Sequence, residues 1–75
     1  MASPLSWPGS HLGLTEVESQ VLELLALGER TTSIARRLEI DPLEVKRHLR
    51  SAYRRLDVRD RSRALAHLAR EGLFS

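Results

Sequence analysis

A run of basic residues between positions 46 and 55 is the part of this sequence best equipped to bind a charged ligand. Arg47, Arg50 and Arg54 are three and four positions apart, so they share one face if the segment is helical. A guanidinium group is a planar fork that binds a phosphate or the paired acceptors on the edge of guanine. The pattern is therefore typical of a polyanion-binding surface, although a solvated helix face has the same composition.

The distribution of charge along the chain favours the same interpretation. The formal net charge is only +2 over the 75 residues. Three basic and seven acidic residues precede Lys46, whereas nine basic and three acidic residues occupy the chain from Lys46 onward. A basic half of this kind indicates binding to a nucleic acid.

Other chemistries find little support in the sequence. The chain has no cysteine, which excludes a disulfide framework and a thiolate metal site. His11, His48 and His67 are not spaced as metal ligands, and no nucleophile–base pair or phosphate-binding glycine loop is present. We therefore expect no metal, no cofactor and no enzymatic activity. No apolar run approaches the roughly 18 residues of a membrane span, so we expect a cytoplasmic protein without a membrane partner.

The elements that must position the basic residues are predicted to be four helices. Residues 1–13 have no charged side chain and no periodicity, and we expect a flexible N-terminal segment. Trp7 within it could instead pack against the domain. Residues 14–75 form the expected domain. Its first helix begins with a capping box between Thr15 and Glu18 and stops at Gly28. The second helix starts with Thr31 or Thr32 as its N-cap.

The third helix has the clearest start, because Asp41 can cap it and Pro42 suits its first turn. It is predicted to span about residues 42–56, with Tyr53 on its core face. A final helix extends from about Asp60 to Glu71. Apolar residues follow no alternating pattern, so the predicted fold class is all-α.

The second and third helices are joined only by Glu39, Ile40 and Asp41. A short turn between two helices, the second of them longer and basic, is the helix-turn-helix arrangement. The major groove of B-DNA is about 12 Å wide and accepts one α-helix, so the third helix would be presented to base edges.

The chain resembles the LuxR/GerE-type helix-turn-helix DNA-binding domain. The similarity begins with Leu14-Thr15-x-x-Glu18-x-x-Val21-Leu22 and continues through Gly28 and Ile34-Ala35-x-x-Leu38-x-Ile40. It is completed by Val45-Lys46-x-His48-Leu49, Tyr53-Arg54-Arg55-Leu56-x-Val58, Arg61-x-x-Ala64 and Gly72-Leu73. The resemblance covers residues 14–74 and implies the sequence-specific DNA-binding domain of a bacterial transcription regulator, whose third helix enters the major groove.

The resemblance also implies a set of contacts with DNA. Base contacts are expected from Lys46, Arg47 and Arg50. Contacts with the DNA backbone are expected from Thr31, Thr32, Arg36, His48, Arg54 and Arg55.

Two of these positions have alternative interpretations, and the role of Glu44 is open. Arg55 could instead pair with Asp57 or a neighbouring acid, and His48 could be a half-buried packing residue beside Leu49. Glu44 departs from the family, which often has threonine or serine there. Its carboxylate repels phosphate, suits the start of a helix and could accept a hydrogen bond from cytosine, so its role is left open.

Double-stranded DNA is the expected partner, and the resemblance implies a homodimer through the last helix, residues 61–74. The alternative is a helix-turn-helix that docks to a protein such as RNA polymerase or another regulator. The acidic first half of the chain and Glu44 motivate that alternative.

Overall fold

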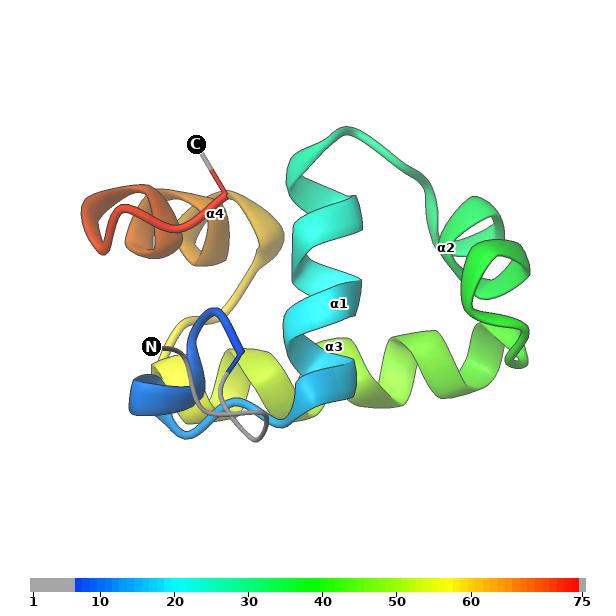
Figure 1. The fold of residues 1–75 in the computed structure, drawn as a ribbon, viewed down its shortest axis with the longest axis horizontal. Coiled ribbons are helices and arrows are strands. Elements are labelled where there is room, and N and C mark those ends of the chain that lie inside the picture. The colour runs from blue at the N-terminus through cyan, green and yellow to red at the C-terminus, as the bar shows by residue number, and fades with distance from the viewer. Residues whose placement is uncertain (1–6, 75) are drawn as a thin grey trace.

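Four α-helices make up most of residues 7–74, which are the residues that the structure, a computed structural model, describes (Figure 1). A short 3-10 helix, η1, covers Ser10–Leu12, and the α-helices are α1 (Glu16–Ala26), α2 (Thr31–Leu38), α3 (Pro42–Leu56) and α4 (Arg61–Arg70). No strand occurs among these residues. The all-α, four-helix class predicted from the sequence is confirmed.

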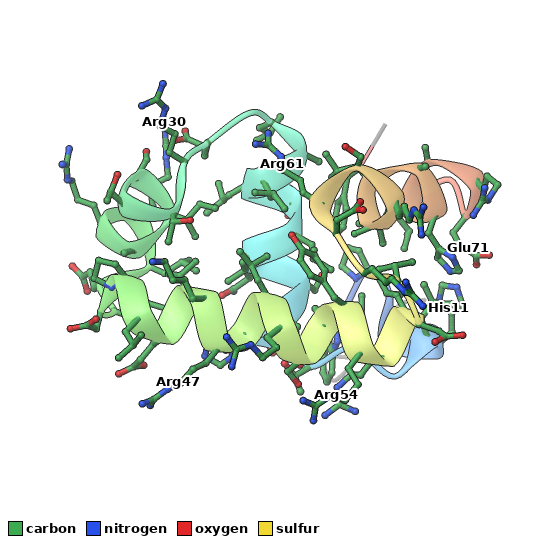
Figure 2. The ribbon with its side chains drawn as sticks, turned by 180° about the vertical axis from the view of Figure 1, so that it is seen from behind. His11, Arg30, Arg47, Arg54, Arg61 and Glu71 are labelled. Carbon is green, nitrogen blue, oxygen red and sulfur yellow. The ribbon has the colours of Figure 1, made fainter. Side chains whose placement is uncertain are left out.

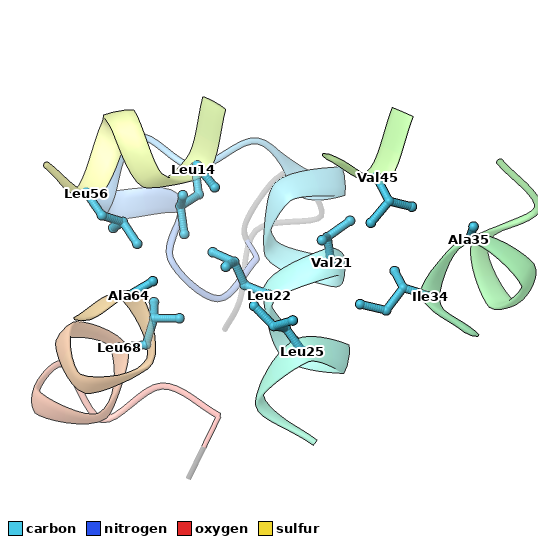
Figure 3. Close-up of a cluster of buried hydrophobic side chains, with 11 residues drawn as sticks. Leu14, Val21, Leu22, Leu25, Ile34, Ala35, Val45, Leu56, Ala64 and Leu68 are labelled. Carbon is cyan, nitrogen blue, oxygen red and sulfur yellow. The ribbon is translucent and has the colours of Figure 1, made fainter. Parts of the chain in front are cut away.

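α1 stands at the centre of the domain, with α2 on one side, α4 on the other and α3 crossing its lower end (Figure 1). The two sides of α1 form two connected parts of one core. Leu22 points toward Ala64 and Leu68 of α4, whereas Val21 points toward Ile34 of α2 and Val45 of α3 (Figure 3). All six side chains are fully or almost fully buried. This packing fixes α3 against the rest of the domain and leaves its other side in solvent.

The starts of the helices follow local signals in the sequence. The predicted capping box of α1 is present, because the Thr15 amide donates to the Glu18 carboxylate at 2.8 Å and the Glu18 amide donates to the Thr15 hydroxyl at 3.1 Å. Asp41 caps α3 by accepting from the Leu43 amide at 2.8 Å. Asp60 caps α4 by accepting from the Arg63 amide at 2.9 Å.

The predicted N-cap of α2 is wrong. Arg30 occupies the extended N-cap position without a side-chain hydrogen bond, and Thr31 is already the first helical residue. The start of α2 is held instead by the Glu29 carboxylate, which accepts from the Ser33 hydroxyl and pairs with the Arg37 guanidinium at 2.8 Å. These two contacts of the Glu29 side chain thus take the place of an N-cap hydrogen bond.

The turn between α2 and α3 is closed by a residue in the left-handed region. Glu39 has φ +56°, and the next amide, that of Ile40, donates back to the Ala35 carbonyl at 3.0 Å. The half-buried Ile40 side chain packs on the core. The same arrangement ends α3, where Asp57 has φ +56° and the following residue is apolar. These turns set the directions in which α3 and α4 leave the preceding helix.

Residues 7–13 lie against the domain in the structure. The Trp7 indole N–H donates to the Leu14 carbonyl at 2.8 Å, and the Ser19 hydroxyl of α1 donates to the Pro8 carbonyl at 2.6 Å. His11 reaches Glu71 at the end of α4, at 3.3 Å. These bonds join distant positions, which a local reading of the sequence cannot predict. Residues 1–6 lie outside the described residues.

None of the helices in the described part of the chain is long and apolar enough to cross a membrane.

Candidate nucleic-acid interface

The outer face of α3 carries a row of exposed arginines. Arg47, Arg50 and Arg54 are all exposed, and their spacing of three and four residues places them on one side of the helix. Arg47 and Arg54 project from the same side of α3, away from the other helices (Figure 2). None of the three pairs with an acidic group among residues 7–74. The row therefore presents free guanidinium donors to solvent on a helix that the core holds in place.

An open groove of about 600 Å³ adjoins this row and extends to the connection between α3 and α4. Apolar and aromatic side chains contribute to its walls, and four basic residues surround them. The lining consists of Lys46, Leu49, Arg50, Tyr53, Arg54, Asp57, Val58 and Arg59. Four cations and a single carboxylate give the groove a positive potential, which suits a phosphate group.

Tyr53 is half-buried in this groove. Burial raises the pKa of its hydroxyl above the ordinary value of 10.0, Arg61 nearby lowers it, and Asp60 raises it further. The hydroxyl is therefore neutral at physiological pH and can donate a hydrogen bond to an anionic oxygen. The periodicity of the sequence assigned Tyr53 to the core alone.

Arg55 points to the other side of α3 and pairs with Glu18 of α1. Its Nε lies 3.0 Å and 3.2 Å from the two carboxylate oxygens of Glu18. The Glu18 side chain is only 2% exposed, and it is also the capping residue that accepts from the Thr15 amide. The acid that Arg55 binds is neither Asp57 nor another neighbour in the sequence, the alternative given above, but a buried glutamate 37 positions away along the chain.

The carboxyl group of Glu18 stays ionised despite its burial. Burial raises its pKa. Hydrogen bonds from the Ser51 side chain, the Thr15 amide and Arg55, together with the positive charge of Arg55, lower the pKa by more than burial raises it. The net result is a pKa below the ordinary value of 4.5. Glu18 therefore ties the start of α1 to the middle and end of α3, on the side opposite the exposed arginines.

The remaining predicted contact residues differ in their exposure and in whether they line the groove. Lys46 is exposed and lines the groove, whereas His48 is half-buried. Glu44 is exposed in the first turn of α3, where a negative charge suits the helix dipole.

The start of α2 lies away from the arginine row. Thr32 and Arg36 are exposed and Thr31 is half-buried. Arg30, which directly precedes them, points to the edge of the molecule opposite Arg47 (Figure 2). The structure thus brings Lys46, Arg50 and Arg54 around one groove, but it does not bring the α2 residues onto the arginine row.

Two residues of this surface received no role from the sequence. Arg59 lines the groove from the connection between α3 and α4, and its place there depends on the angle between the two helices. Leu43 is exposed in the first turn of α3, four positions before Arg47. Its helical spacing from Arg47 and Arg50 was available in the sequence and could have identified it.

Comparison with known proteins gives a consistent family. The family described as bacterial regulatory proteins, luxR family, matches residues 12–69, which is most of the chain. The match extends the resemblance in the sequence toward the N-terminus by two residues and includes all of α1, α2 and α3.

Two curated proteins are similar to the chain. The spore germination protein GerE of Bacillus subtilis (strain 168) is 39% identical over 59 residues, which cover 79% of this chain and 80% of GerE. A candidate HTH-type transcriptional regulator of Escherichia coli (strain K12), YhjB, is 43% identical over 51 residues, covering 68% of this chain. The chain spans about a quarter (26%) of the length of YhjB. No solved structure matches the chain.

Proposed function

Because this chain belongs to the luxR family of bacterial regulatory proteins, we propose that it binds double-stranded DNA as part of a transcription regulator, with the outer face of α3 in the major groove. The observation that carries the proposal is the row of Arg47, Arg50 and Arg54, exposed and without acidic partners, on a helix braced by the core. The name of YhjB, an HTH-type transcriptional regulator, supports the same role. Such a role requires binding and no catalysis.

The contacts divide by position. Lys46, Arg47 and Arg50 are the proposed base contacts: Lys46 and Arg47 lie in the N-terminal half of α3, the part of a recognition helix that approaches base edges, and Arg50 lies about one turn further along the same face. Arg54 and the groove residue Arg59 are proposed to contact phosphates.

Four further residues are proposed to contribute contacts with the DNA backbone at the margin of the surface: Thr31, Thr32, Arg36 and His48. Arg55 is left out of the proposed set, because its guanidinium is already bound to the buried carboxylate of Glu18.

Two acidic groups reduce the expected affinity. Asp57 lines the groove beside Arg54, and Glu44 is exposed in the first turn of α3. Each carboxylate repels the phosphates that the neighbouring arginines attract, so we expect weaker non-specific binding than the arginines alone would give.

A homodimer through residues 61–74 is part of the proposal, but Leu73 and Phe74 pack against the core of their own chain. The contact is therefore assigned to the exposed side of α4, where Ala66 and Ala69 are three positions apart and small enough for close helix approach. Sedimentation equilibrium tests this: a monomer at all concentrations, with and without DNA, would contradict the dimer.

The test of DNA binding is a fluorescence-anisotropy titration against a duplex of random sequence. Each phosphate contact contributes about −0.9 to the slope of log K against log salt concentration, so binding should weaken steeply between about 50 mM and about 200 mM salt. Arg54→Ala should make the slope less steep by about one contact. Arg30→Ala removes the same charge at the edge of the molecule opposite Arg47 (Figure 2) and is the control; it should change the slope less than Arg54→Ala does.

The alternative function is docking to a protein, such as RNA polymerase or another regulator. Absence of any duplex binding at low salt, for a protein shown to be folded, would contradict the proposal and favour this alternative.

A further inference from the structure

Leu43 is an exposed apolar residue on the basic face of α3. Its side chain is 56% exposed, and it is absent from the set of half-buried apolar residues that pack against the core. Because Leu43 lies four positions before Arg47 and seven before Arg50, it belongs to the same face of the helix. Large apolar residues are also exposed at Val17 and Leu27, but neither lies on α3.

The start of α3 does not require leucine at this position. Asp41 caps the helix by accepting from the Leu43 backbone amide, which any residue other than proline supplies. The apolar contact that fixes the entry of a helix joins the residue before the cap to the fourth helical residue, here Ile40 and Val45. These two side chains lie against the core, whereas Leu43 is not part of the core cluster and more than half of it is exposed.

We propose that Leu43 contacts the C5 methyl group of a thymine in the major groove and so helps to determine the sequence that the domain prefers. This inference rests on the proposed function. Thymine fits because its methyl is the one apolar group that a base pair displays on its major-groove edge. Against any other base edge, the leucine side chain would cover polar atoms without hydrogen-bonding to them. Its place in the first turn of α3 is where recognition helices approach bases.

The test begins with selection of preferred duplexes from a random library by the wild-type protein. Each thymine of the selected site is then replaced by uracil, which keeps the base pair and removes only the methyl group. At one thymine in each half-site, uracil should weaken wild-type binding about fourfold, the effect of exposing one methyl group. Leu43→Ala should weaken binding to the thymine site by a similar or larger factor.

The test depends on whether the Leu43→Ala substitution and the uracil substitution affect binding independently. With Leu43→Ala, replacing that thymine by uracil should have no further effect, because the alanine side chain does not reach the methyl group. The matched control is Leu27→Ala, at an exposed leucine that follows α1, which should respond to uracil as the wild type does.

Two outcomes overturn the proposal in distinguishable ways. The wild type could select a site at which no uracil substitution weakens its binding, or every uracil substitution could weaken the binding of Leu43→Ala as much as that of the wild type. In either case the proposed role of Leu43 is wrong and the proposal of DNA binding stands. If the folded wild type binds no duplex at low salt, DNA binding itself is wrong and the role of Leu43 falls with it. Urea unfolding of both variants checks that neither loses its fold.

Discussion

Arg54 and Arg55 are adjacent in the chain but differ in their surroundings, so replacing each with methionine separates DNA binding from folding. Methionine keeps the length and apolar packing of the stem and removes the guanidinium group. In Arg55→Met, the Glu18 carboxylate, only 2% exposed, loses the donor that lies 3.0 Å away. It keeps the Thr15 amide at 2.8 Å. In Arg54→Met, no ion pair of the described residues is lost.

The size of the effect follows from what Glu18 loses. A hydrogen bond to a charged group contributes about 1.5–3 kcal/mol to stability. Because the Arg55 side chain is 45% exposed and water can partly replace it, we expect the lower part of that range, about 2 kcal/mol. A chain of 75 residues has a total stability of about 4–11 kcal/mol, so this loss is a substantial fraction. It corresponds to a fall in Tm of about 10 °C.

The assay is urea unfolding followed by circular dichroism at neutral pH, together with anisotropy titration at low temperature, where both variants remain folded. Arg55→Met should lose about 2 kcal/mol of stability and keep the wild-type DNA affinity and salt dependence. Arg54→Met should keep its stability within about 0.5 kcal/mol and lose affinity. The reasoning is refuted if Arg55→Met is as stable as the wild type, or if it loses as much DNA affinity as Arg54→Met while folded.

Three further predictions concern single residues. The pKa of Glu18 lies below 4.5 in the folded state, because its hydrogen bonds outweigh the effect of burial. Its contribution to stability is therefore complete above pH 4.5 and lost as the pH falls through the lowered value, so Glu18→Gln should flatten the acid side of a plot of urea midpoint against pH. Asp57→Asn tolerates the left-handed backbone at φ +56° and removes a carboxylate from the groove; anisotropy should show tighter DNA binding at low salt, and an unchanged affinity would contradict the repulsion. Trp7→Phe loses the 2.8 Å bond to the Leu14 carbonyl and should cost about 1 kcal/mol in urea unfolding, whereas no loss would mean that this bond adds nothing to stability.

The sequence predicted the features of the fold that depend on near neighbours. The capping box of Thr15 and Glu18, the cap at Asp41 and the stop at Gly28 each involve residues within a few positions, and all three are present. The cap of α2 was missed, because Thr31 and Thr32 are typical capping residues while the actual bridge uses the side chain of Glu29.

Contacts between residues far apart in the chain could not be predicted from the sequence. Nothing local indicates that Arg55 will bind Glu18 or that Trp7 will donate to Leu14, since both depend on how the segments fold onto α1 and α3. Helical spacing was enough to place Arg47, Arg50 and Arg54 on one face. The groove beside them was not predictable, because it requires the angle between α3 and α4 that brings Arg59 next to Tyr53.

The central claim is that the exposed face of α3 is the DNA-binding surface, and its most direct test is an NMR titration of ¹⁵N-labelled protein with a duplex at low salt. We expect the amide signals of α3 between residues 43 and 54 to shift most, together with those of the connection around Arg59. Signals at the end of α1, near Leu27, should remain in place. Shifts confined to α1 or to the far end of α4, with α3 unaffected, would contradict the claim.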